Sequence, residues 1–289
     1  VYKRQMFGFA VWNEKEQTLM LARDFFGIKP VYYAEIDGHF VFASEIKSIL
    51  AFPGYERKVN QKALEQYLSF QYSPLEETFF KGIYKLMPGH MLLYKNGSYE
   101  IKTYFKPKLT PGQWNHKTNM AQLRSQLSEI LKDSVKHHML SDVEVGAFLS
   151  GGVDSGYLAS SSGADQAFTV GFDEGDRYSE VNKAAKVAEK AGLKHHVKII
   201  SKQEFWDALP DVMYHMDEPL ADASAVALYF LSKEAAGHVK FVLSGEGADE
   251  LFGGYNIYRE PESLKKIAWI PFGVRRVTVS YTHLRAHET

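Results

Sequence analysis

Two short loops carry most of the residues that could do chemistry. The first, Ser150-Gly151-Gly152-Val153-Asp154-Ser155, follows an apolar run and precedes a helical pattern. Its glycines let the backbone approach an anion, and the N–H groups that open the next helix point at that anion, as in a phosphate cradle. Asp154 would repel a phosphate unless a cation lay between them, which indicates Mg²⁺ carrying pyrophosphate. A glycine turn with Asp154 as a plain helix N-cap is the structural alternative.

The second loop, Ser244-Gly245-Glu246-Gly247-Ala248-Asp249-Glu250, places three carboxylates within five residues after the apolar run 241–243. Acidic capping of a helix would account for Asp249 and Glu250, because the first turn of a helix favours negative charge. It does not account for Glu246 or for the glycines on either side of it, which open backbone conformations closed to other residues. The pattern favours a functional loop. No G-x-x-x-x-G-K-[ST] motif occurs, so an ordinary P-loop NTPase is disfavoured.

Alternating strands and helices must position both loops. Helices are predicted at 118–140, from 154, at 179–191, after a Ser201/Glu204 capping box, and at 223–236; strands are predicted at 143–149, 167–172, 196–200 and 240–243. Such alternation predicts a parallel doubly wound sheet, whose ligands bind beyond the carboxyl ends of the strands. Both loops follow strands in this way.

The first hundred residues have a different pattern. Short strands at 7–12, 18–22, 31–33 and 40–42, turns at Asp37-Gly38 and Asn96-Gly97, and helices at 44–51 and after the N-cap Asn60 predict an antiparallel α+β domain with an aromatic core. The stretch 106–117 contains Thr110-Pro111-Gly112 and is the predicted linker. The fold class is therefore α/β plus α+β.

Composition limits the function further. A length of 289 residues with 45% apolar content predicts two domains, and a net charge of −1 argues against nucleic acid or an anionic membrane as a partner. The absence of cysteine excludes disulfides, Cys-ligated zinc and a cysteine nucleophile from the chain as given. No apolar run is long enough to span a membrane and no signal peptide is recognised, so we expect a soluble, cytoplasmic protein. His137-His138 and His195-His196 lack the i, i+4 spacing of a zinc pair on a helix and are assigned no chemistry.

The motifs resemble those of a known family. Ser150–Ser155 resembles the pyrophosphate loop of the PP-loop ATP pyrophosphatases, and together with 243–255 it is similar to the synthetase domain of glutamine-hydrolysing asparagine synthetases. Segments 22–33 and 42–47 resemble the later part of that family's glutaminase domain. The resemblance covers roughly residues 6 to 270. It implies part of an Ntn-type glutaminase domain with antiparallel sheets at 6–105, the linker 106–117, and part of a PP-loop adenylating domain with a parallel sheet at 118–279.

The resemblance implies a ligase that uses ATP and Mg²⁺ to convert aspartate to asparagine through β-aspartyl-AMP, with ammonia or glutamine as the nitrogen source. Glu246 would be the catalytic residue, as the base that deprotonates the attacking ammonium, and Asp154 and Asp249 would hold Mg²⁺. Asp222 or Ser224 would contact the substrate ammonium, although Asp222 is equally typical of a helix N-cap. The implied ATP-binding residues are Leu149, Ser150, Gly151, Gly152, Asp154, Ser155, Val170, Ser244 and Gly245. The resemblance is compatible with a homodimer.

The sequence also departs from the family. The N-terminal cysteine of the glutaminase domain is absent, so we expect no glutamine hydrolysis by the chain as it stands. Residues 1–5 do not resemble the family and residues 280–289 have no continuing helix pattern, so both are expected to be non-native tails. A basic residue that the family uses in adenylation is also expected to be missing. The activity of this chain is therefore open. Two alternatives remain: a β-lactam-synthetase-like adenylating ligase, and a non-catalytic nucleotide-binding module.

Overall fold

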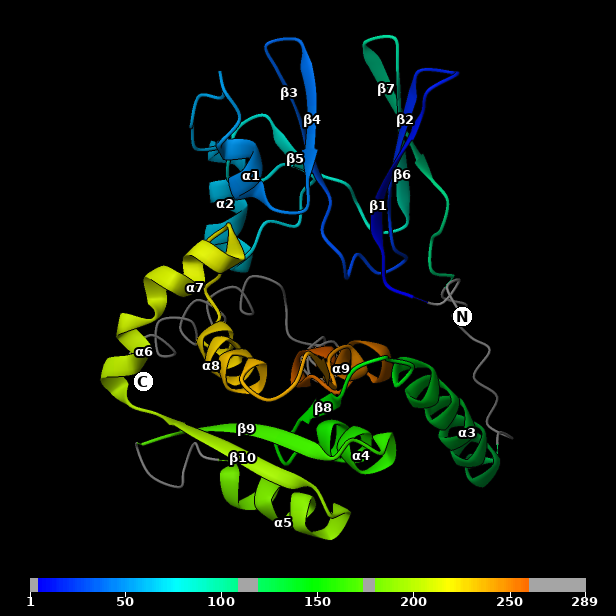
Figure 1. Ribbon diagram of the computed structural model, residues 1–289, viewed down its shortest axis with the longest axis vertical. Helices are drawn as coiled ribbons and strands as arrows, with labels where there is room; N and C mark the ends of the chain where they lie inside the picture. Colours follow the sequence, from blue (N-terminus) through cyan, green and yellow to red (C-terminus); the bar gives the residue numbers. More distant parts are fainter. Residues whose placement is uncertain (1–4, 109–118, 174–179, 260–289) are drawn as a thin grey trace, which may run out of the picture.

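The computed structural model describes residues 5–108, 119–173 and 180–259. The structure has two halves that lie one above the other (Figure 1). One half contains β1–β7, α1 and α2, and the other contains β8–β11 and α3–α9. Most of the predicted linker and nearly all of both predicted tails lie outside the described residues. Within those three ranges, no helix is both long enough and apolar enough to cross a membrane.

The N-terminal half consists of two antiparallel sheets. One has the order β1-β2-β6-β7, and the other has the order β4-β3-β5. Both predicted turns are confirmed, with positive φ at Asp37 and Asn96 and at the glycines that follow them. The elements are β1 (Gly8–Asn13), β2 (Thr18–Arg23), β3 (Tyr32–Ile36), β4 (His39–Ala43), α1 (Ile46–Leu50), α2 (Gln61–Phe70), β5 (Ile83–Lys85), β6 (His90–Lys95) and β7 (Ser98–Thr103).

The core of this half lies mainly around β2, β3 and β6. Leu21 and Leu92 are completely buried, and Tyr33 packs with them. The expectation that the aromatic strands all form core is wrong for β1. Trp12 is 50% exposed and Phe9 42% exposed, because β1 is an edge strand paired only with β2 in its sheet.

A buried acid organises the loop between β2 and β3. Asp24 is 2% exposed and accepts hydrogen bonds from the N–H groups of Phe26, Ile28 and Lys29 at 3.1, 3.0 and 2.9 Å. Burial on its own would raise the pKa of Asp24, but these N–H donors outweigh it and lower the pKa below its usual 3.8. The Arg23 guanidinium donates to the carbonyl oxygens of Lys29, Gly27 and Leu86, which fastens the same loop to the residue that follows β5.

We expect Asp24→Asn to lower the free energy of unfolding at neutral pH by about 2 kcal/mol, because charge-assisted hydrogen bonds are lost at a buried site. A depressed pKa stabilises the fold above the unfolded-state value, and this contribution disappears as pH falls through the folded-state pKa. The gap between parent and variant should therefore close below about pH 3.8. Urea unfolding at several pH values measures it, with the exposed Asp37→Asn as the matched control. A gap that persists in acid would contradict the prediction.

The C-terminal half holds the predicted parallel sheet, with the order β10-β9-β8-β11 and every pair parallel. The strands are β8 (Val145–Phe148), β9 (Gln166–Phe172), β10 (Lys194–Ile200) and β11 (Phe241–Leu243). The chain moves outward from β8 to β10 on one side, then returns to place β11 on the other side of β8. The direction of winding thus reverses between β8 and β11, and the carboxyl ends of these two strands form the topological switch point.

Helices cover both faces of this sheet. α4 and α5 pack on one face, and α8 packs on the other (Figure 1). Asn119 caps α3, and the predicted Ser201/Glu204 capping box is present at the start of α6. The helices are α3 (Met120–His138), α4 (Val153–Ser162), α5 (Val181–Ala191), α6 (Lys202–Asp207), α7 (Leu209–Met216), α8 (Ser224–Ala236) and α9 (Ala248–Phe252), followed by a 3-10 turn at Asn256–Arg259.

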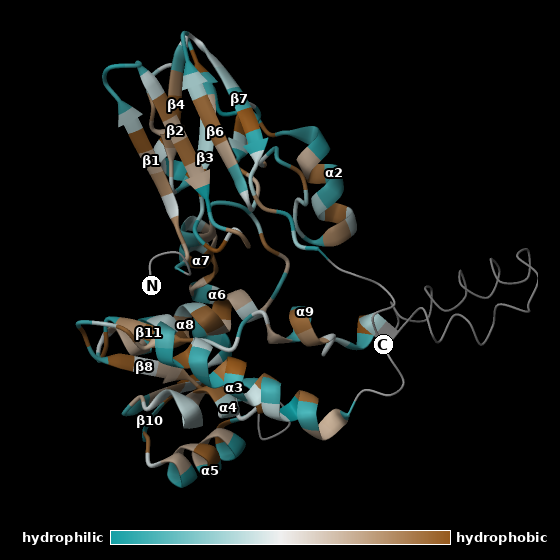
Figure 2. Ribbon diagram, turned by 90° about the vertical axis from the view of Figure 1, so that its right-hand side faces the viewer, coloured by the Kyte–Doolittle hydropathy of each residue, from teal (hydrophilic) through white to brown (hydrophobic). Residues whose placement is uncertain are grey.

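The long helix α3 is amphipathic, with hydrophobic and hydrophilic bands alternating along it (Figure 2). Leu127, Leu131 and Val135 from its apolar stripe line a cavity that the second loop also lines. Other residues of the predicted stripe are more open, and Ile130 is 65% exposed. The helix therefore forms one wall of the switch-point region.

Candidate functional site

The first loop is closed by its two serines. Ser150 Oγ and Ser155 Oγ are 2.8 Å apart, the N–H of Ser150 donates to Ser155 Oγ at 3.1 Å, and the N–H of Gly152 donates to Ser150 Oγ at 3.3 Å. α4 begins within this loop, at Val153, so the first N–H groups of the helix have no carbonyl partners within it. The loop thus presents the donors that an anion requires.

Asp154 does not cap this helix. The N-cap is Gly152, which makes no side-chain capping bond, and Asp154 lies within the first turn. The interpretation of Asp154 as a plain N-cap is therefore wrong. Its carboxylate is exposed and lines the cavity described below.

Gly151 occupies a position that a side chain cannot share. Its φ is +79°, and a Cβ would lie 2.7 Å from Lys183 Cβ and 2.8 Å from the backbone N of Ala184. The loop is therefore packed directly against the start of α5. Both the left-handed backbone and the close approach require glycine here.

The second loop meets the first at Gly245. A Cβ on Gly245 would lie 3.3 Å from the backbone N of Ser155, so the two backbones are in close contact. Gly247 has a φ of +92°, which turns the chain into α9. Because β8 and β11 are hydrogen-bonded neighbours, the loops that follow them are brought together although about ninety residues separate them in the sequence.

A cavity of about 560 Å³ lies beside this junction, between α3, α4 and α9. Asp154 and Glu246 line it together with Ser244 and Gly245, while most of the remaining wall is apolar. Ser244 Oγ lies 3.5 Å from Glu246 Oε1. Two carboxylates from different loops thus share one largely apolar cavity.

Asp249, the other predicted metal ligand, is directed elsewhere. It does not line this cavity, and a Cβ on Gly254 would overlap Asp249 Oδ1. Its neighbour Glu250 accepts a hydrogen bond from Tyr255 OH at 2.9 Å, and this bond is the main cause that raises the pKa of Tyr255 to about 12. The acids of this loop therefore point to two different places. Glu246 lines the cavity, whereas Asp249 and Glu250 lie against residues 254–255.

Two of the expected nucleotide-binding residues belong to the core. Leu149 is 2% exposed and packs among Ala147, Ala159 and other core residues, with its carbonyl accepting from Thr169 Oγ1 at 2.6 Å. Val170 is half-buried and packs against the core beneath α7 and α8. Neither residue lines the cavity, and Leu149 lies directly before the first loop.

Asp222 and Ser224 are exposed at the start of α8. Asp222 Oδ1 accepts from the N–H of Ser224 at 2.9 Å, and the Asp222 carbonyl accepts from the N–H of Ala225 at 3.2 Å. The N-cap of α8 is Ala223, so Asp222 lies one residue before the cap and its predicted N-cap role is wrong by one position. Neither Asp222 nor Ser224 lines the cavity shared by Asp154 and Glu246.

The sequence analysis missed the two acids that join the halves. Asp217, at the end of α7, accepts from the N–H of Ile46 at 2.7 Å and from that of Lys47 at 3.3 Å, and it pairs with Lys47 Nζ at 2.7 Å. Glu218 accepts from the N–H of Phe79 at 2.7 Å. No local pattern could have identified these contacts, because the partners lie 139 to 171 residues away in the sequence.

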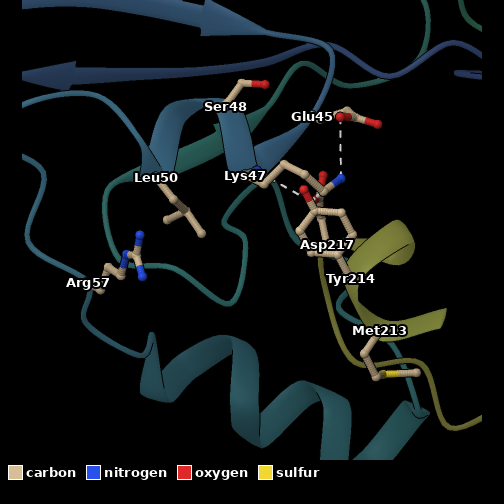
Figure 3. A pocket seen from close by; sticks show the side chains of 8 residues that line it. All are labelled: Glu45, Lys47, Ser48, Leu50, Arg57, Met213, Tyr214 and Asp217. Atoms are coloured by element: carbon tan, nitrogen blue, oxygen red, sulfur yellow. Dashed lines mark hydrogen bonds and ion pairs between the residues drawn. The ribbon is translucent and has the colours of Figure 1, made fainter. Parts of the chain in front are cut away.

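Figure 3 shows this junction, where Lys47 extends toward Asp217 and Tyr214 from α7. A cavity of about 570 Å³ opens beside it, and Arg57 lies at its other side. Burial would lower the pKa of Lys47, but the hydrogen bond to Asp217 and the nearby Glu45 outweigh it and raise the pKa above its usual 10.5. Lys47 therefore stays charged and ties α1 to α7.

Comparison with known proteins agrees with these two halves. Residues 126–288 match the asparagine synthase family and residues 3–105 match the glutamine amidotransferase domain family. The chain is 43% identical over 95% of its length to asparagine synthetase [glutamine-hydrolyzing] 1 of Bacillus subtilis strain 168, covering 43% of that protein. Asparagine synthetase [glutamine-hydrolyzing] 3 of the same strain is 30% identical over 92% of the chain, which covers 46% of it.

A fungal relative has a different name. The amidase chyE of Penicillium rubens is 30% identical over 89% of the chain, which covers 40% of that protein. The chain thus spans less than half the length of each of these relatives. The match to the asparagine synthase family nevertheless extends over more than half of the chain. The chain belongs to the asparagine synthase family.

Proposed function

We propose that this chain contributes to an ATP-dependent ligase that converts aspartate to asparagine through β-aspartyl-AMP. The observation that carries the proposal is the contact between the Ser150–Ser155 and Ser244–Glu250 loops at the switch point, with Asp154 and Glu246 on one cavity. Switch points are where sheets of this kind bind nucleotides. Family membership and the relatives named asparagine synthetases support the choice of substrate.

The Ser150–Ser155 loop would bind the β- and γ-phosphates of ATP. The N–H groups that open α4 and the two serine hydroxyls supply donors without a permanent cation. In this role Gly151 and Gly152 would let the phosphates approach the backbone closely. Ser244 and Gly245 would line the part of the site that holds the adenosine. Leu149 and Val170 would support this site from the core beneath it.

Mg²⁺ suits the donor set of the cavity. Asp154 supplies carboxylate oxygens to this cavity, and hard divalent cations are bound by one or two carboxylates together with phosphate oxygens. When bound, the cation would neutralise charge on the departing pyrophosphate. Asp154 is the ligand that the geometry favours, and Asp249 would have to turn away from Gly254 to join it.

The chemistry would proceed in two displacements. A β-carboxylate oxygen of aspartate bonds to the α-phosphorus of ATP while the bond to the bridging oxygen breaks, so that pyrophosphate leaves. The nitrogen of ammonia then bonds to the activated carbonyl carbon, and AMP leaves with the carboxylate oxygen. The resemblance associates Glu246 with both displacements: it would take part in forming β-aspartyl-AMP, the step that pyrophosphate exchange reports, and it would accept the proton that the attacking nitrogen releases. We propose ammonia as the attacking nucleophile, supplied by glutamine in the full-length parent, as the names of the glutamine-hydrolyzing relatives suggest.

Glu246→Gln should lower aspartate-dependent ATP–pyrophosphate exchange by about 10²- to 10³-fold, since the loss of a charged group at the reacting centre has effects of this size. The fold should be retained, because the side chain is exposed. Exchange of labelled pyrophosphate into ATP with and without aspartate is the measurement.

Glu250→Gln is the matched control, because it removes a carboxylate from the same loop but one that contacts Tyr255. It should leave exchange within about twofold of the parent. Equal exchange by the two variants would contradict the role of Glu246. Exchange with another carboxylic acid but not aspartate would favour the β-lactam-synthetase-like alternative, and ATP binding without any exchange would favour a nucleotide-binding module.

A further inference from the structure

A group of potential metal ligands lies near the amino ends of the strands of the parallel sheet, whereas both loops follow the carboxyl ends. Among the residues that the structure describes, His196, Glu234 and His238 form one group in which a ligand atom of each lies within 4.8 Å of the others. His196 lies near the start of β10, Glu234 in the last turns of α8, and His238 just before β11. The loops around Asp154 and Glu246 follow the carboxyl ends of their strands, so the group lies away from the proposed nucleotide site.

The ring of His196 is held in place from two sides. It stacks on Phe168, with ring centroids 5.0 Å apart and planes 17° apart, and Phe168 is completely buried. Its Nε2 lies 2.8 Å from Gln166 Oε1. The Gln166 amide nitrogen donates to Glu144 Oε1 at 2.6 Å, which fixes the amide oxygen toward His196.

This chain of hydrogen bonds selects a tautomer. Because a carbonyl oxygen faces Nε2 of His196, Nε2 must carry the proton, and Nδ1 keeps its lone pair. An imidazole that donates one N–H to an oxygen acceptor while the other nitrogen is free is the arrangement found around metal-binding histidines.

The other two side chains are anchored by the core beneath them. Glu234 precedes Ala235 and His238 precedes Val239, which are 2% and 5% exposed and pack around Phe168. His238 Nε2 lies 3.5 Å from Glu234 Oε1, and the His196 and His238 ring centroids are 4.0 Å apart. Two imidazoles this close can bind one cation together.

We propose that His196, Glu234 and His238 form a binding site for a borderline divalent cation, with Zn²⁺ as the preferred ion. Two imidazoles and one carboxylate suit Zn²⁺ and disfavour Mg²⁺, which prefers oxygen ligands. Three protein ligands leave one position for water. The ion would link β10 to the connection between α8 and β11, and so hold β11 against the sheet.

The test is calorimetric titration of the chelator-treated 289-residue chain with Zn²⁺ alone. The expected result is one equivalent bound, with no competition from a large excess of Mg²⁺. His196→Gln and His238→Gln should each weaken binding by more than about 100-fold, and Gln166→Leu by about 10- to 100-fold, the range for the loss of an outer hydrogen-bond partner. His137→Gln/His138→Gln on α3 is the matched control and should bind as the parent does.

If the parent chain does not bind one equivalent of Zn²⁺, the proposal is wrong, whatever the variants show. Zn²⁺ binding that survives in the His196→Gln/His238→Gln double variant, or that disappears in the α3 control, would assign the ion to other histidines. Circular dichroism of each variant confirms that the fold is retained. Thermal unfolding gives a second readout, because Zn²⁺ should raise the midpoint of the parent and not that of His238→Gln, whose side chain is exposed.

Discussion

Gly151→Ala should lower the free energy of unfolding by about 2–5 kcal/mol and weaken the binding of ATP by about 100-fold. A non-glycine residue at a φ of +79° costs about 1–2 kcal/mol. The new Cβ would also press on the backbone N of Ala184 at 2.8 Å, and overpacking of this kind costs about 1–3 kcal/mol. Relief of that contact must move the loop away from α5, and a displacement of about 1 Å at a binding site is enough for a 100-fold loss.

Gly163→Ala is the matched control for this prediction. Gly163 ends α4 with a φ of +72°, but a Cβ there would meet nothing within 4 Å. It should therefore show the backbone cost of about 1–2 kcal/mol and leave ATP binding unchanged. Chemical denaturation and calorimetric titration with ATP measure the two effects. If both variants lost equal stability and bound ATP equally well, the packing of Gly151 against α5 would not be what constrains the loop.

Asp217→Asn should separate the unfolding of the two halves and lower the free energy of unfolding by about 3 kcal/mol. Asn tolerates the left-handed backbone at this position, where φ is +64°, so the substitution isolates the charge. Removal of one partner from a buried ion pair costs about 3–5 kcal/mol, and the lower value applies because Lys47 keeps 20% of its side chain exposed. Scanning calorimetry should resolve two transitions in place of one.

The pH dependence of this effect follows from Lys47. Its pKa is raised in the folded state, so the stabilisation by the pair is complete at neutral pH and is lost only as pH rises above about 10.5. The difference between parent and Asp217→Asn should therefore be constant from pH 6 to about 9 and narrow in stronger alkali. A difference that vanished near neutrality would mean that another group supplies the charge.

The neighbouring acid Glu218 serves as the control. Burial raises its pKa above the usual 4.5, although the N–H of Phe79 opposes the shift, so Glu218 itself makes the fold less stable as pH rises through that range. Glu218→Gln keeps an oxygen that can accept from Phe79 and removes the cost of burying a charge. It should leave stability at neutral pH unchanged or raise it, opposite in sign to Asp217→Asn.

Local signals in the sequence predicted most of the fold. The hairpins at Asp37-Gly38 and Asn96-Gly97, the cap at Asn60 and the Ser201/Glu204 capping box depend on residues within a few positions of each other, and all are present. Strand β5 was missed because three residues are too few for a period-2 pattern. The exposure of β1 could not be predicted, because its alternation is the same whether a second sheet covers it or not.

The site was predicted less completely. The two loops were recognised because glycines and acids after strands are local features, and the switch point followed from the order of the elements. The direction in which each acid points was not predicted. Asp249 and Glu246 are three residues apart, yet only Glu246 lines the cavity. The roles of Asp217, Glu218 and His238 depend on contacts over tens to hundreds of residues, for which one sequence has no signal.

The placement of β11 beside β8 determines the order in which this half can fold. β8, β9 and β10 pair with their neighbours in sequence and form a local unit that can close early. Val145 pairs with Phe241 across about a hundred residues, and this long-range closure is slow because its loop entropy must be overcome first. The cavity between the two loops therefore comes into existence only when the last strand docks. A nucleotide can recognise the finished sheet but cannot assist the early steps of its assembly.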